Sequence, residues 1–312
     1  MVSQSAQEPP PIRRDGFGTR LVEQVPKLGR VERLRVSASL ATAGSEQAIR
    51  ARAAHLTRLG PGPVARVLRI ERKGTAVSIL SEMPDGVTLS DILAALEFKT
   101  FTLSDEEALE LAALVVRAAG VMHETLGTLA HGALSPAHVV VTREGSIVFT
   151  GAVFGDAIRA LRRDREQLWR EFGLALPPSD SLPTFDQRGD VTQLGALVLA
   201  IGQRRWLARD EFPKRINDLV MATSIGSNAQ TNSRLRTWLQ NTLQVEGRVV
   251  FDSCIEPARK FNRVLPQGGN DEAEALALRA AILQLCGEPS NAPAASTWSS
   301  SVIAEFSYSS FA

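Results

Sequence analysis

Cysteine is almost absent from this sequence of 312 residues. Cys254 and Cys286 are the only two, they lie well apart, and no histidine or second cysteine stands near either at ligand spacing. This scarcity argues against a disulfide framework and against structural zinc, and it favours a reducing compartment. We therefore expect a cytoplasmic protein without a metal site.

Lysine is also scarce, since five of the 35 basic residues are lysines and none lies between Lys99 and Lys214. The 34 acidic residues bring the net charge to +1, so no chain-wide field would attract nucleic acid or anionic lipid. The longest strongly apolar run, residues 194–201, covers less than half of the roughly 20 residues that a membrane-spanning helix needs. We expect neither nucleic acid nor a membrane as a partner.

The remaining composition is that of a globular protein. Apolar residues make up 44% of the chain and charged residues 22%, enough for one large or two modest domains with real cores. Residues 1–15 are polar, proline-rich and without the apolar segment of a secretory signal, and they predict a disordered lead-in. Residues 288–312 are rich in serine and predict a flexible tail.

The patterning between these ends predicts mixed α and β structure. Residues 21–40 predict two strands, and a helix that Ser45 can cap follows them until the GPGP segment at residues 60–63. Residues 64–81 predict a strand hairpin, followed by a bend and a short helix. Residues 104–126 carry a wide apolar face behind an acidic first turn, which predicts a long buried helix. A loop, a second hairpin and a mainly helical remainder complete the order.

This order, together with five short motifs, resembles the serine/threonine protein kinases of bacteria over residues 31–261. The motifs are AIRARAAHLTRLGPGPVARVLRI, SEMPDGVTLSDIL, LVVRAAGVMHETLGTLAHGALSP, RGDVTQLG and LRTWLQNTLQVEGRVVFDS. They are similar, in turn, to the regulatory helix with its following strand, the hinge, the helix leading into the catalytic loop, the start of the central helix, and the closing helix. The resemblance implies an α+β, two-lobed protein-kinase-like fold. It places a small, degenerate, β-rich lobe at residues 16–83, a mainly helical lobe at residues 84–287, and the hinge at Glu82 and Met83.

Residues 131–141 (HGALSPAHVVV) have the frame of the kinase catalytic loop, H-R-D-L-K-P-x-N, followed by an apolar strand. In kinases the Asp of this motif accepts the substrate hydroxyl proton, the Lys neutralises the transferred phosphoryl group, and the Asn holds a metal ion. Ala133, Ser135 and His138 stand in those three places. The resemblance therefore implies a catalytic loop without its reactive residues.

The groups that would bind nucleotide phosphates are altered as well. Arg52 takes the place of the Glu on the regulatory helix, which reverses the charge there. The strand that should carry the phosphate-binding Lys offers Arg33 or Arg35 as its nearest basic residues, and Arg does not replace this Lys freely. Gly16–Phe17–Gly18 is only a fragment of the glycine-rich motif, and such fragments usually occur by chance.

No carboxylate stands where the resemblance places the second metal-binding residue, the Asp of D-F-G. Gly151 takes that place, and Phe154 and Gly155 match the F-G part after a short insertion. Asp156 is the nearest acid, and we expect it to be a solvated loop residue. His138 without a carboxylate partner would make a poor Mg²⁺ site, because Mg²⁺ prefers oxygen ligands. The resemblance thus implies no metal-binding residue.

Other motif residues keep their structural roles under the resemblance. His131 would pack inside and link the loop to the core, and Pro136 would keep the loop in frame. Asp190 would hold the backbone of the catalytic loop. Its alternative role is an ordinary helix N-cap, in a capping-box-like pair with Gln193. Both roles for Asp190 are structural.

We therefore expect a pseudokinase, a binding, scaffolding or regulatory module without phosphotransfer activity, because transfer depends on the missing groups. No cofactor is expected. ATP with Mg²⁺ belongs only to an alternative, an atypical serine/threonine kinase or ATP-binding protein that uses displaced residues. A third possibility is an unrelated helical adaptor, which would lack the small sheet.

The partner of such a module would be another protein. Residues 161–174 (LRRDREQLWREFGL) stand where kinases have their activation segment, and they carry an arginine-rich face with Trp169 and Phe172. Packed aromatics with solvated charges are the usual structure of such a segment, and a protein-docking helix is the alternative. The sequence does not indicate an oligomeric state.

Overall fold

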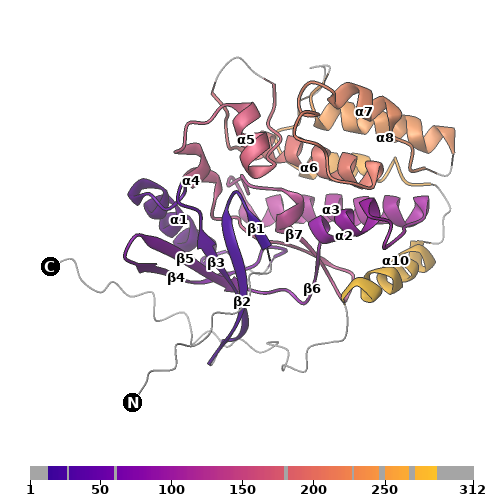
Figure 1. The fold of residues 1–312 in the computed structure, drawn as a ribbon. Helices are drawn as coiled ribbons and strands as arrows, with labels where there is room; N and C mark the ends of the chain where they lie inside the picture. The colour runs from indigo at the N-terminus through magenta and orange to yellow at the C-terminus, as the bar shows by residue number, and fades with distance from the viewer. Residues whose placement is uncertain are drawn as a thin grey trace.

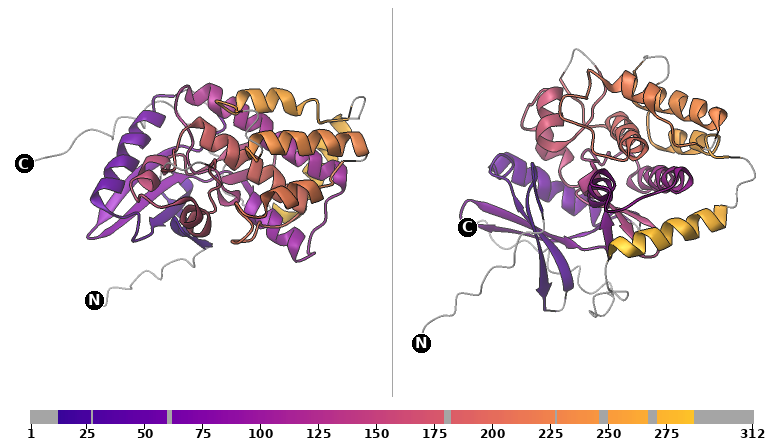
Figure 2. Two further views of the ribbon diagram at one scale, coloured as in Figure 1. Left: turned by 90° about the horizontal axis from the view of Figure 1, so that it is seen from above. Right: turned by 45° about the vertical axis from the view of Figure 1, so that its right-hand side comes forward.

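The computed structural model describes residues 13–26, 28–59, 62–178, 182–226, 228–245, 250–266 and 271–286. Within them, one part consists of a five-stranded sheet with a helix, and the other part is mainly helical. Figures 1 and 2 show the sheet and helix α1 on one side of the molecule and the larger helical part on the other. We call these parts the small lobe and the large lobe.

The small-lobe sheet has the strand order β1-β2-β3-β5-β4, with antiparallel neighbours throughout. Its strands are β1 (Arg13–Asp15), β2 (Gly18–Val25), β3 (Gly29–Val36), β4 (Val67–Lys73) and β5 (Ala76–Glu82). Leu34 of β3 lies opposite Ile79 of β5, and both side chains are buried. Strand β1 begins inside the predicted lead-in, whereas residues 1–12 and the predicted tail lie outside the described residues.

Helix α1 (Ala43–Leu56) crosses from β3 to β4 and packs near α4 (Gly155–Arg159) of the large lobe. Its N-cap is Thr42, whose side chain accepts a hydrogen bond from the Ser45 backbone N–H. The predicted cap at Ser45 was therefore wrong. The helix turns Ile49, Arg52 and Ala53 inward, so a charged residue is buried on its packed face.

A second sheet, in the order β6-β7-β8, supports the catalytic-loop region in the large lobe. Strands β7 (Val139–Thr142) and β8 (Ile147–Phe149) form the predicted second hairpin, and β6 (Gly86–Thr88) adds a strand where we predicted only a bend. The 3₁₀ turn η1 (Pro136–His138) leads into β7. The catalytic-loop sequence is thereby fixed between the helices and this sheet.

The helices of the large lobe pack around α3 (Asp105–Leu126), which the capping box of Ser104 and Glu107 starts. Helix α3 contacts α6 (Gln187–Gln203), α9 (Ile255–Phe261) and α10 (Asp271–Cys286). The remaining helices are α2 (Leu89–Glu97), α5 (Arg165–Phe172), α7 (Ile216–Ala222) and α8 (Ala229–Thr242). Among the helices that the structure describes, none is both long and apolar enough to cross a membrane.

Two hydrophobic clusters form the core of the described residues. The larger lies within the large lobe around α3 and α6. The second joins the lobes: it contains Phe17 and Leu34 of the small lobe together with Ala133, Phe154 and Phe172 of the large lobe. The catalytic-loop region is therefore part of a continuous apolar core between the lobes.

Candidate functional site

The catalytic-loop segment at residues 131–141 is buried along its whole length. The carboxylate of Asp190 on α6 fixes its start. Oδ2 of Asp190 accepts a hydrogen bond from the His131 N–H at 2.5 Å, and Oδ1 accepts one from the Gly132 N–H at 2.7 Å. The side chain of Asp190 has no exposed surface, so these charge-assisted bonds form in a low-dielectric interior, where they are strong.

Two further side chains complete this support. The Nδ1 atom of His123 accepts from the Cys254 N–H at 2.9 Å, so the ring proton is on Nε2, which donates to Asp190 at 2.9 Å. One turn along α6, Gln193 Oε1 accepts from the Leu134 N–H at 2.6 Å. Helix α6 is capped by Asp186, whose side chain accepts from the Gly189 N–H. The alternative role of Asp190 as an N-cap paired with Gln193 was therefore wrong.

His131 links the loop to the end of β8. Its Nε2 donates to the Thr150 carbonyl at 3.0 Å, and its Nδ1 accepts from the Ala133 N–H at 3.3 Å. Burial lowers its pKa to about 4, so the ring is neutral at physiological pH. A neutral imidazole with both nitrogens bonded to backbone has no free proton acceptor.

His138 stands at the metal-holding position, and its ring is fully buried. Its Nδ1 donates to the Ala133 carbonyl at 2.8 Å, which leaves the lone pair on Nε2. That nitrogen lies 2.7 Å from Nη2 of Arg20 and accepts its hydrogen bond. Burial, together with the nearby Arg20, lowers the pKa of His138 well below its ordinary value. The nitrogen that could coordinate a cation therefore already binds a guanidinium.

Arg20 reaches His138 from strand β2. Its side chain is only 6% exposed, and two carboxylates balance its charge: Glu32 at 2.6 Å from Nη1 and Asp15 at 3.3 Å from Nε. Arg33 makes its ion pairs with Glu23 and Glu71 instead. The cation that contacts His138 is thus supplied by β2, and it was not predicted from the sequence.

A signal for Arg20 was present in the sequence. When residues 18–25 and 29–36 pair around the turn between them, Val22 lies opposite Glu32, which puts Arg20 diagonally across from that carboxylate. Neither predicted candidate on β3 is an adequate substitute, because Arg33 is paired elsewhere and Arg35 is exposed.

Phe17 fills the space beside His138. It lies in the turn between β1 and β2, is 1% exposed, and contacts three rings of the large lobe. The centroid distances are 4.4 Å to His138, 5.1 Å to Phe154 and 5.1 Å to Phe172. This one side chain therefore joins the small lobe to the catalytic loop, to the F-G position and to α5.

The flanking glycines make this insertion possible. A Cβ on Gly16 would lie 1.9 Å from the Glu171 carbonyl oxygen, and a Cβ on Gly18 would lie 1.9 Å from the Arg35 carbonyl oxygen. Gly18 also has a φ of +147°, which L side chains rarely adopt. The Gly16–Phe17–Gly18 fragment thus forms a tight turn with a structural purpose, which the interpretation as a chance match did not anticipate.

Asp15 occupies the backbone donors of the same turn. Its Oδ1 accepts from the Phe17 N–H at 2.9 Å and from the Gly18 N–H at 3.1 Å. Consecutive backbone N–H groups in a turn form anion-binding sites, and in kinases the glycine-rich loop covers the phosphates. In this chain the anion at the turn is a carboxylate of the protein itself.

Gly151 leaves no room for a carboxylate at the second metal position. Its φ is +78°, and a Cβ would lie 2.7 Å from His138 Nε2. The nearby acid, Asp156, lies at the start of α4 and pairs with Arg159. Across the part of the chain that the structure describes, no three acidic, histidine or cysteine side chains are grouped as metal ligands.

Arg52 joins the two loops that border the cleft. Its Nε donates to the Ala152 carbonyl at 3.2 Å, beside Gly151, and its Nη2 donates to the Ala130 carbonyl, directly before His131. A Glu here would place a carboxylate against two carbonyl oxygens. Arg52 therefore fixes α1 to the large lobe through backbone contacts instead of pairing with a strand cation.

The remaining predicted residues lie close to these. Ala133 is fully buried in the cluster that joins the lobes, and Ser135 Oγ lies 3.4 Å from His138 Nδ1. Pro136 begins η1, and Gly155 begins α4.

At the hinge position, the Glu82 carboxylate accepts hydrogen bonds from the Arg66 backbone N–H at 3.1 Å and from the Arg66 Nε at 2.7 Å. Met83 follows the end of β5. Ala133, Ser135, His138 and Gly151 are thus brought together, whereas Glu82 and Met83 lie at the end of β5, an inner strand of the small sheet.

Replacement of Asp190 by Asn tests the support of the loop. We expect Asp190→Asn to lower the free energy of unfolding by about 2–4 kcal/mol, because one oxygen that accepts buried N–H groups becomes an NH₂ donor. Asp186→Asn on the same helix is the matched control, with a change within about 0.5 kcal/mol, because Asn caps helices as well as Asp. Urea unfolding measures both, and equal losses would contradict the assigned role.

Replacement of Phe17 by Ala tests the filled cleft. We expect Phe17→Ala to lower the free energy of unfolding by about 3–5 kcal/mol, because a buried ring contacted by three others is removed. The control is Phe98→Ala, where the side chain is 77% exposed and the change should stay within about 0.5 kcal/mol. A small effect at Phe17 would show that the turn is not packed into the cleft.

Restoring the missing carboxylate should fail for a steric reason. We expect Gly151→Asp to cost at least about 2 kcal/mol of unfolding free energy, because it combines a positive φ with a clash against His138. His138→Ala removes the clash, so the double variant should lose less than the sum of the single losses. Additive losses in this double-mutant cycle would contradict the coupling of the two positions.

Comparison with known proteins agrees with this architecture. No family model matches the sequence, and no curated protein matches it. The kinase domain of PknI from Mycobacterium tuberculosis superposes with a TM-score of 0.56 at 18% identity, over 80% of this chain and 92% of that one. A single-residue mutant of that domain gives 0.57 at 19% identity, over 81% and 93% of the two chains. Identities this low establish the fold alone. The superpositions confirm the fold that the five motifs predicted. This chain has a two-lobed protein-kinase-like fold.

Proposed function

We propose that this protein is a pseudokinase, a binding, scaffolding or regulatory module that keeps the kinase shape without phosphotransfer activity. The filled cleft is the observation that carries the proposal. Phe17 and Arg20 of the small lobe pack against His138 in the place where a kinase would hold its metal ion and phosphates. A nucleotide with its metal ion would have to displace both side chains.

The chemistry of the loop supports the same conclusion. Phosphoryl transfer relies on positioning and on charge stabilisation, with little covalent work for the protein. In this chain the methyl group of Ala133 cannot accept a proton, Ser135 carries no positive charge, and Gly151 has no side chain to bind a metal ion. Arg20, the cation that contacts His138, is balanced by Glu32 and Asp15. We therefore propose that neither ATP nor Mg²⁺ is a cofactor.

A second candidate follows from the comparisons, because the similar solved structures are of kinase domains. Under it, the chain would be an atypical serine/threonine kinase that uses displaced residues, with Asp156 as its nearest acid. The ion pair of Asp156 with Arg159 weighs against this role, since the carboxylate is directed to a surface partner. Under the proposal, the chain acts through a protein partner in the cytoplasm.

Incubation of the purified protein with labelled ATP tests the proposal. With Mg²⁺ or Mn²⁺ and generic protein substrates, we expect no incorporation above that of a heat-denatured control, because the groups that transfer phosphate are missing. We also expect the melting temperature to be unchanged by ATP with either metal, since a ligand that binds the native state would raise it. Incorporation that Asp156→Asn abolishes would overturn the proposal in favour of the displaced-residue kinase.

A further inference from the structure

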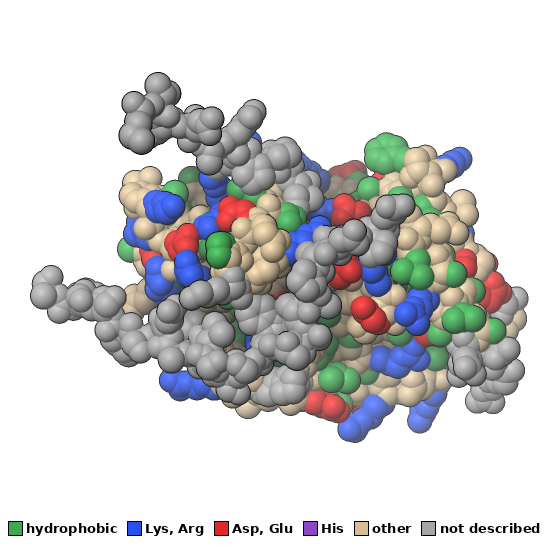
Figure 3. Space-filling model, turned by 90° about the horizontal axis from the view of Figure 1, so that it is seen from below, with side chains coloured by type: hydrophobic (Ala, Val, Ile, Leu, Met, Phe, Trp, Pro, Cys, Tyr) green, Lys and Arg blue, Asp and Glu red, His purple; other side chains and the backbone are tan. Residues whose placement is uncertain are grey.

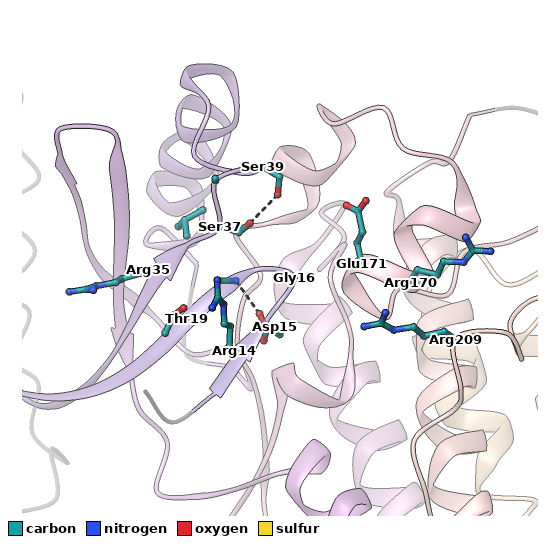
Figure 4. Close-up of a pocket in the computed structure, with 13 residues that line it drawn as sticks. Arg14, Asp15, Gly16, Thr19, Arg35, Ser37, Ser39, Arg170, Glu171 and Arg209 are labelled. Atoms are coloured by element: carbon teal, nitrogen blue, oxygen red, sulfur yellow. Dashed lines mark hydrogen bonds between the residues drawn. The ribbon is translucent and has the colours of Figure 1, made fainter. Parts of the chain in front are cut away.

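A groove lies on the outer side of the Phe17 turn. Its lining does not include Phe17, Arg20 or His138. It has a volume of about 710 Å³, within the range of ligand sites, and it lies between the β1–β2 turn, the end of β3, α5 and the segment after α6. Figure 4 shows its two walls facing each other across an open space. Its charged lining residues are Arg14, Arg35, Arg170, Arg209, Asp15 and Glu171.

The two walls of the groove each carry an uncompensated arginine. Arg14 on β1 and Arg209 after α6 are both exposed, and neither has an ion-pair or hydrogen-bond partner among the described residues. Figure 4 shows Arg209 extending from the large-lobe wall towards the β1–β2 turn. Arg35 and Arg170 lie at the outer ends, with their heads turned away from the centre in the same view.

The two acids of the lining do not cancel this charge. Asp15 already accepts hydrogen bonds from the Phe17 and Gly18 N–H groups and pairs with Arg20. Glu171 pairs with Arg163 outside the groove, at 3.6 Å. On the face drawn in Figure 3, by contrast, basic and acidic side chains lie side by side. The groove is therefore a local excess of positive charge on a chain whose net charge is only +1.

We propose that this groove binds a peptide segment that carries a phosphoserine or phosphothreonine. A phosphoryl group has a charge of about −1.5 to −2 and three acceptor oxygens, so it can bridge guanidinium groups on opposite walls. A single carboxylate carries only one negative charge and two acceptor oxygens, so it offers less charge and one acceptor oxygen fewer than a phosphoryl group. The Ser37 and Ser39 hydroxyls, 3.1 Å apart on the small-lobe wall, supply further donors.

Such a ligand would also influence the position of Phe17. The small-lobe wall of the groove is the reverse side of the turn that inserts Phe17, and the opposite wall is α5, which carries Phe172. A phosphoryl group bound between Arg14 and Arg209 would draw these walls together and favour the packed position of Phe17. The proposal rests on the protein acting by binding, but occupancy of the groove does not depend on whether the cleft also admits nucleotide.

Fluorescence anisotropy with the full chain tests the groove. The probes are degenerate fluorescein-labelled peptide pools with a fixed central phosphoserine, with serine, or with glutamate at that position. We expect the phosphoserine pool to bind at least about tenfold more tightly than the serine pool, with the glutamate pool weaker than the phosphoserine pool. We expect the binding to weaken as salt is raised, because the contacts are exposed.

The double variant Arg14→Glu, Arg209→Glu should lose this binding by at least about tenfold, whereas Arg259→Glu on α9, outside the groove, should keep it. Circular dichroism shows whether each variant is folded. The proposal would be overturned if the phosphoserine and serine pools bound equally well, or if the double variant kept its binding of the phosphoserine pool. It would also be overturned if inorganic phosphate competed while the protein showed no preference among the peptide pools. Binding of anionic vesicles in place of the peptides would do the same. A rise in melting temperature with ATP would contradict the proposed function, but it would not affect the conclusion about peptide binding in the groove.

Discussion

A hydrogen bond from the Arg20 guanidinium to the neutral ring of His138 ties the two lobes of this protein together. Burying an arginine is costly unless its charge is balanced and its donors are satisfied. Glu32 and Asp15 balance the charge of Arg20, and the lone pair on His138 Nε2 accepts a hydrogen bond from the Arg20 Nη2. This arrangement requires His138 to be neutral, which its lowered pKa ensures. It also requires the absence of a side chain at Gly151, since a Cβ there would meet the same nitrogen.

The catalytic-loop region keeps its shape through side chains that do not stand at the phosphate-binding or metal-binding positions of the kinase motif. Asp190 and Gln193 of α6 accept hydrogen bonds from the loop backbone at 2.5 to 2.7 Å, and His123 of α3 donates to Asp190 at 2.9 Å. The positions at which a kinase would act on phosphate instead serve packing in this chain. Arg52 binds loop carbonyls, and Phe17 fills the space beside His138. Under the proposed function, shape and chemistry are supported by different residues, so the kinase shape can persist without phosphotransfer.

Local signals in the sequence predicted the order of elements and the frame of the loop. The capping box at Ser104 and the apolar face behind it specify a long helix from neighbours alone. The packing of Phe17 and the contact of Arg20 with His138 escaped prediction because these partners lie far along the chain: His138 is 118 positions from Arg20. A Gly-Phe-Gly turn in a polar region gives no sign of what it packs against. The N-cap of α6 was misplaced for a similar reason, since Asp186 and Asp190 are both acceptable caps and only the buried loop distinguishes them.

A crystal structure determined in the presence of Mg²⁺ and a non-hydrolysable ATP analogue tests the central claim, that the cleft is filled by the protein itself. We expect no nucleotide density between the lobes, with the Phe17 ring packed on His138 and the Arg20 guanidinium bonded to its Nε2. Nucleotide density in the cleft, with Phe17 displaced and the phosphates bound by the N–H groups that Asp15 now occupies, would contradict it.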